Sequence, residues 1–146
     1  MLRVSLIIAA FVLYSYTTFA AGTPIIINHT SCKIDQVPTQ YVELAKSMFK
    51  ITYGHTSHGS QIVSGMELLA NKSGSIYKYN SGAGSLVFND YTPDGDLGNP
   101  DRTTWASRTR SYLNSHSDIN VVMWSWCGQV DGSEEEINSY LSLMNQ

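Results

Sequence analysis

Residues 120–124 (Asn-Val-Val-Met-Trp) constrain the fold more than any other segment of this chain. They form an almost continuous apolar run, which is typical of a strand covered on both faces in a parallel sheet. A second apolar segment, residues 51–53, ends at Gly54 and predicts another short strand. Each segment is followed by a polar turn and then by a helical pattern. This alternation predicts an α/β fold with a parallel sheet and helical crossovers.

The spacing of apolar residues predicts helices around these strands. The expected helices run from Thr39 to residue 49, over residues 61–70, from Thr103 or Thr104 to residue 113, and from Ser133 to the end of the chain. Thr39 is expected to be the N-cap of the first. The last has acidic residues in its first turn, where the helix dipole favours them. Its apolar side is expected to comprise Ile137, Tyr140, Leu141 and Met144.

The first 21 residues have the pattern of a secretory signal peptide. One cation, Arg3, precedes an apolar run over residues 4–14, and small residues follow at Ala20 and Ala21. Such an order is typical of a cleaved leader, and the run is shorter than the roughly 20 residues that span a bilayer. We therefore expect a secreted or periplasmic protein whose single domain, residues 22–146, contacts no membrane after cleavage. A buried first helix or strand is the alternative interpretation.

The composition narrows the classes of function. Of the 146 residues, 42% are hydrophobic and 14% are charged, and the formal net charge is −3. This charge argues against nucleic acid as a partner. Two cysteines are too few for a four-thiolate zinc site. In an oxidising compartment Cys32 and Cys127 can pair with each other, both can remain buried thiols, or one can pair with a cysteine outside this chain.

The polar turn of residues 54–60 carries the clearest candidates for chemistry. Ser57 and Ser60 lie near the start of a predicted helix, with His55 and His58 beside them. A serine in such a turn can act as a nucleophile, because neighbouring amides can stabilise an oxyanion. For Ser60, helix capping is the simpler role. Half of a zinc site at the two histidines is an alternative that lacks evident further ligands.

The longest irregular segment, residues 73–100, is expected to be a loop with at most one short strand at residues 85–88. Residues 94–101 are rich in carboxylates and glycines, a composition that can indicate a calcium site. The spacing does not match an EF-hand loop, however, and Asx turns explain the same composition. Arg102, Arg108 and Arg110 either bind an anionic group or form a solvated helix face. No metal site is expected.

Residues 53–61 (Tyr-Gly-His-Thr-Ser-His-Gly-Ser-Gln) resemble the first block of secreted SGNH/GDSL-type hydrolases, in the divergent branch with a Gly-His-x-Ser-x-Gly turn. The resemblance implies a three-layer, flavodoxin-like parallel sheet, with Ser57 as nucleophile and the amides of Ser57 and Gly59 near the oxyanion. The turn at residues 124–129 takes the place of the family's third block, with Gln129 instead of its Asn. The family's last block, Asp-x-x-His, has no counterpart, so the domain is expected to be truncated at its C-terminus.

These features together predict a secreted, serine-dependent hydrolase that acts on a small-molecule or carbohydrate acyl ester without a cofactor. Ser57 is expected to attack the carbonyl, supported by Gly59 and Gln129, and the base is expected from sequence beyond this chain. The expected substrate contacts are His55, His58 and Trp126. The alternative function is a non-catalytic secreted binding or adhesion module on the same α/β frame.

Overall fold

The structure, a computed structural model, describes residues 28–98, 100–128 and 131–146. The predicted leader and Gln129 lie outside these residues. The chain divides into two compact units, residues 1–34 and 35–146. The described part of the first holds η1 (His29–Ser31), which the Asn28 side chain caps, and η2 (Ile34–Gln36) begins at its end. Within the described ranges, every helix is too short or too polar to cross a bilayer.

The second unit contains a parallel sheet of three strands in the order β2-β1-β3. The strands are β1 (Lys50–His55), β2 (Val87–Asp90) and β3 (Val121–Ser125). The register pairs Tyr53 with Asp90, and His55 with Ser125, so all three strands end at the same edge. The prediction of an α/β fold with a parallel sheet is confirmed, and this strand order is compatible with a flavodoxin-like fold.

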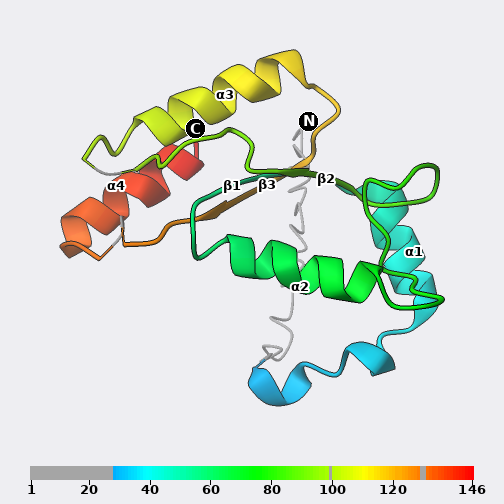
Figure 1. The fold of residues 1–146 in the computed structure, drawn as a ribbon. Helices are drawn as coiled ribbons and strands as arrows, with labels where there is room; N and C mark the ends of the chain where they lie inside the picture. Colours follow the sequence, from blue (N-terminus) through cyan, green and yellow to red (C-terminus); the bar gives the residue numbers. More distant parts are fainter. Residues whose placement is uncertain (1–27, 99, 129–130) are drawn as a thin grey trace, which may run out of the picture. The chain divides into compact units, whose positions relative to one another are not determined.

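Four helices flank the sheet: α1 (Thr39–Met48), α2 (Ser60–Ala70), α3 (Thr104–Ser115) and α4 (Glu134–Met144). The chain passes from β1 through α2 to the strand on one side, and then from β2 through α3 back across β1. Because right-handed crossovers in opposite directions place their helices on opposite faces, α2 covers one face, and α3 covers the other together with α4 (Figure 1).

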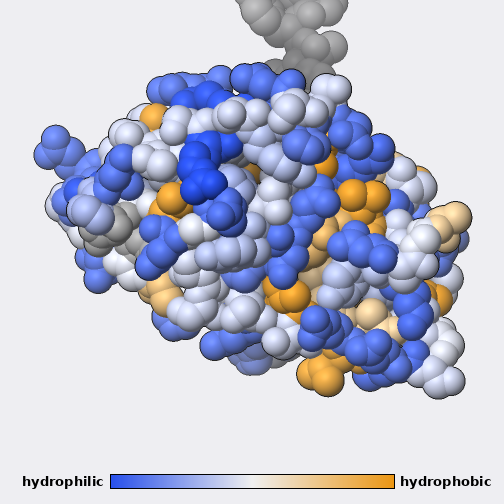
Figure 2. Space-filling view, turned by 45° about the horizontal axis from the view of Figure 1, so that its top comes forward, coloured by the Kyte–Doolittle hydropathy of each residue, from blue (hydrophilic) through white to orange (hydrophobic). Residues whose placement is uncertain are grey.

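Aromatic side chains fill the core on both faces. Tyr53 and Phe88 are each 1% exposed, with ring centroids 5.7 Å apart. On the α3 and α4 face, Trp105 and Tyr140 are buried. Burying one such side chain contributes about 1.5–3 kcal/mol relative to leaving it exposed. The face of the molecule seen in Figure 2 is mostly hydrophilic or neutral, and its apolar residues form separate patches.

Several expected boundaries and faces differ from the structure. The helix α1 begins at Thr39 itself, and the N-cap is Pro38. The second strand forms at Val87–Asp90, two residues beyond the segment expected. In α4 only Tyr140 of the predicted apolar side is buried, while its other members, Ile137, Leu141 and Met144, are exposed. The strand β3 lies at an edge of the sheet, which leaves Val122 41% exposed instead of covered on both faces.

The strand β1 runs two residues further than expected, through Gly54 and His55. Gly54 pairs with Trp124 of β3, and a Cβ at residue 54 would lie 2.6 Å from the Trp124 indole. The glycine that was expected to end the strand is instead the residue that allows an indole to pack over it. The polar turn is therefore only four residues long, residues 56–59.

Candidate active site

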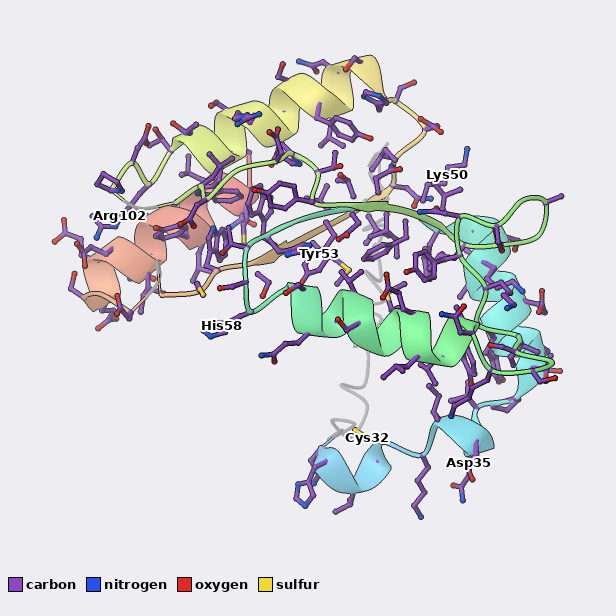
Figure 3. All side chains as sticks on the ribbon, in the orientation of Figure 1. Cys32, Asp35, Lys50, Tyr53, His58 and Arg102 are labelled. Carbon is purple, nitrogen blue, oxygen red and sulfur yellow. The ribbon has the colours of Figure 1, made fainter. Side chains whose placement is uncertain are left out.

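The candidate site lies at the edge of the sheet where the three parallel strands end. Ligands and catalytic groups of open α/β sheets gather at this edge. Figure 3 shows His58 on the turn between β1 and α2, at the opposite end of β1 from Lys50. Because His55 pairs with Ser125, Ser57 and Cys127 each follow two residues after the end of neighbouring strands.

Three side chains from these two strand ends are in contact. The Sγ of Cys127 lies 3.0 Å from Nδ1 of His58 and 2.9 Å from Oγ of Ser57. Ser57 and His58 are exposed, and Cys127 is half-buried. The cluster is therefore open to solvent while its sulfur is packed against two hydrogen-bonding groups.

This arrangement suits proton transfer from a thiol. An imidazole nitrogen at hydrogen-bond distance can accept the thiol proton, and the resulting thiolate is the nucleophilic form of cysteine. The serine hydroxyl can donate a hydrogen bond to that thiolate. The cluster therefore contains a Cys–His pair with a hydroxyl group as hydrogen-bond donor.

A second pair, between His55 and Asp90, lies beside the cluster. His55 is 5% exposed, and its Nε2 lies 2.7 Å from Oδ1 of Asp90 at the end of β2. Its Nδ1 lies 2.8 Å from the carbonyl oxygen of Thr56. A carbonyl oxygen can only accept, so Nδ1 carries a proton. The other ring nitrogen, Nε2, faces the carboxyl group of Asp90.

Backbone hydrogen bonds define the short turn that carries Ser57 and His58. The Gly59 amide donates to the Thr56 carbonyl at 2.9 Å, and the Tyr53 hydroxyl donates to the Gly59 carbonyl at 3.4 Å. The amides of Ser57 and His58 donate to no acceptor in the described part of the chain. These two N–H groups are therefore available to an oxyanion, whereas the Gly59 amide is engaged by the turn.

The structure brings together some of the predicted site residues and separates others. Ser57 and His58 lie together beside Cys127, whereas His55 is buried beneath the turn. The Trp126 ring packs against Trp105 and Tyr140, with centroids 5.1 Å away in each case. The expectation that Ser60 caps the helix is wrong: the N-cap of α2 is Gly59, and the Ser60 hydroxyl donates to the Ser57 carbonyl instead of accepting from a backbone amide.

Two residues of the site, Cys127 and Asp90, were not among the predicted site residues. Cys127 was considered for a disulfide with Cys32, but neither forms one among the described residues. A signal for Cys127 was present, since it follows a predicted strand as closely as Ser57 follows another. Asp90 lies just past the segment expected to be a strand, and no local sequence pattern indicates that it contacts His55.

The acidic segment before α3 is used for capping and pairing. Asp101 accepts hydrogen bonds from the hydroxyls and backbone amides of Thr103 and Thr104. The Thr104 hydroxyl and these other donors hold the pKa of Asp101 well below its usual range. Asp94 pairs with Arg108 at 2.6 Å. Within the described residues, no cluster of three His, Cys, Asp or Glu side chains could hold a metal ion.

Comparison of the chain with protein-family models, with curated proteins and with solved structures finds no match in any of the three.

Proposed function

We propose that this protein is an exported ester hydrolase that works by covalent acyl transfer where β1 and β3 end. One observation carries the proposal: the contact of the Cys127 sulfur with both His58 and Ser57. A nucleophile, a base and a hydrogen-bond donor meet there at an exposed edge of the sheet. The resemblance of residues 53–61 to SGNH-type hydrolases supports an ester as substrate and an SGNH-type elaboration of the observed sheet.

The proposal assigns the attack to Cys127 and a supporting hydrogen bond to Ser57. The imidazole of His58 contacts the thiol, and in the described residues no histidine nitrogen is hydrogen-bonded to the Ser57 hydroxyl. A thiol loses its proton far more readily than a serine hydroxyl, and the thiolate is an intrinsically strong nucleophile. The expected attack by Ser57 is the competing route, and the experiment below separates the two.

In the proposed reaction, His58 takes the thiol proton and the thiolate attacks the ester carbonyl carbon. A C–S bond forms, and the carbonyl electron pair moves to oxygen, where the Ser57 and His58 amides are the available donors. The C–O bond then breaks, and the leaving alkoxide takes the proton from the His58 imidazolium. A water next loses its proton to His58 and attacks the thioester, which releases the acid and restores the thiol.

The test is incubation of the full chain with 4-nitrophenyl acetate, followed by peptide mass spectrometry. We expect an acetyl group on Cys127 and loss of 4-nitrophenolate release in Cys127→Ala. Removing the base in His58→Ala is expected to slow release about 100-fold. Cys32→Ala is the matched control and should leave the rate unchanged, since the Cys32 thiol is exposed and its only hydrogen bond among the described residues goes to the Asn28 carbonyl.

Two results contradict this assignment. An acetyl group on Ser57 that persists in Cys127→Ala would return the nucleophile to the serine. No acetyl group on either residue, with hydrolysis at the rate of the buffer, would favour the non-catalytic binding module.

A further inference from the structure

The pair formed by His55 and Asp90 has no role in the chemistry described above. The imidazole is almost completely buried, and the side chain of Asp90 is 40% exposed. An ion pair removed from water contributes little net stability, because the loss of hydration offsets the attraction between the charges. Stability alone is therefore a weak reason for placing an imidazole and a carboxyl group together beneath the turn.

We propose that His55 and Asp90 are positioning residues: they hold the turn of residues 56–59 so that Ser57 and His58 face Cys127. This inference rests on the proposed function, because it gives the pair its purpose at that site. Nδ1 of His55 donates to the Thr56 carbonyl at the start of the turn, and Nε2 is fixed by Asp90. His55, a residue of β1, thus links Asp90 at the end of β2 to the turn.

Packing against the same ring fixes the other end of the turn. A Cβ on Gly59 would lie 2.3 Å from Cβ of His55 and 2.7 Å from its Nδ1, so the backbone of Gly59 rests directly on this side chain. The Tyr53 hydroxyl holds the Gly59 carbonyl, and the Tyr53 and His55 rings lie 4.5 Å apart. Both ends of the turn therefore depend on where the His55 ring lies.

The segment after β2 is in turn held against β1. The Thr92 amide donates to the Tyr53 carbonyl at 2.9 Å, and the Thr52 hydroxyl donates to the Thr92 carbonyl at 2.7 Å. Tyr91, between Asp90 and Thr92 in the sequence, adopts a left-handed conformation with φ of 50°. Its ring lies edge-on to the His55 ring, with the centroids 5.7 Å apart. A non-glycine residue held in this conformation costs free energy that the surrounding contacts must offset.

Two substitutions of Asp90 separate positioning from charge. In Asp90→Ala the Nε2 of His55 loses its partner. In Asp90→Asn the amide can donate to Nε2 of a neutral ring, while Nδ1–H still donates to Thr56. If the pair acts by positioning, Asp90→Asn should keep the placement of the turn that Asp90→Ala loses, although neither variant carries the negative charge.

The first measurement is the rate of iodoacetamide alkylation at Cys127 divided by the rate at Cys32 in the same folded chain. Misplacing the turn should lower this ratio about tenfold or more in Asp90→Ala, and Asp90→Asn should restore it. Asp118→Ala is the matched control, since it removes a carboxylate that pairs with Lys50 at the other end of β1. An unchanged ratio in Asp90→Ala would overturn the inference.

The second measurement, hydrogen exchange of the backbone amides of Gly59 and Ser60, which both donate to the Thr56 carbonyl, does not require the thiol to react. Faster exchange in Asp90→Ala but not in Asp90→Asn supports positioning, and equal exchange in both overturns it. If both cysteines of the unsubstituted chain are alkylated equally fast, the nucleophile assigned above is wrong. Exchange in the turn then still decides whether the pair positions it.

Discussion

At the scale of single residues, two glycines allow the close packing on which the site depends. Gly54 lies beneath the Trp124 indole, and Gly59 rests on His55. Both contacts join the end of β1 to its surroundings, one toward β3 and one toward the turn. Neither glycine has a positive φ, so the absence of a side chain, not backbone freedom, is what the structure requires of them.

Replacing these glycines tests this packing. Gly59→Ala should destabilise the protein by about 1–3 kcal/mol, as overpacking in a filled site does, and should also displace the turn. Gly65→Ala is the matched control, because a Cβ there meets nothing within 4 Å; in the interior of the helix α2 it should stabilise by up to about 1 kcal/mol. Urea unfolding measures both. Equal free energies of unfolding for the two variants would contradict the account.

At the scale of elements, the start of α3 depends on one side chain. Asp101 accepts from the N-cap residue Thr103 and from Thr104, the first residue of the helix, and these hydrogen bonds depress its pKa in the folded state. A depressed pKa means that the carboxylate stabilises the folded state above the unfolded value of about 3.9. That contribution is lost progressively as the pH falls below this value toward the folded pKa.

The variants Asp101→Ala and Asp101→Asn separate the charge from the cap. Asparagine keeps a side-chain oxygen that can accept from the Thr103 and Thr104 amides but does not ionise, so Asp101→Asn should keep more stability than Asp101→Ala and weaken the acid dependence. Thermal unfolding measured across the acid range tests this. An acid dependence in Asp101→Asn equal to that of the unsubstituted protein would exclude Asp101 as its source.

The sequence predicts the existence of the elements better than their contacts. Local periodicity is enough for α2 and for the acidic start of α4, whose Ser133 forms a capping box with Glu136. Whether β2 or β3 lies beside a given turn depends on strand order, which no local pattern contains. The contact between His58 and Cys127 therefore becomes visible only in the assembled sheet, although each residue lies in a turn that was recognised. The exposed face of α4 has the same cause, since burial depends on what packs against it.

At the scale of the whole molecule, the sheet joins two aromatic cores. All three tryptophans, Trp105, Trp124 and Trp126, lie in the cluster with Tyr140 on the α3 and α4 face. Tyr53 and Phe88 pack together in the other. The two cores share β1 and β3, whose ladder runs from Ile51 to His55. Losing one core leaves that ladder covered on a single face, so we expect the two to unfold together.

Tryptophan fluorescence and far-UV circular dichroism test this cooperativity, because fluorescence reports one core and circular dichroism reports the helices on both faces. The two unfolding curves should coincide in urea. In Tyr140→Ala, which removes a ring that is 2% exposed, both should shift together by about 3–5 kcal/mol. Tyr140→Phe is the matched control: it keeps the ring and loses the hydroxyl, with its hydrogen bond to the Gly98 carbonyl and its interaction with Arg102, so its shift should be smaller. If fluorescence changes at lower urea than circular dichroism, the α3 and α4 face unfolds separately. The edge where Cys127 meets His58 would then lie on the boundary between two independent units.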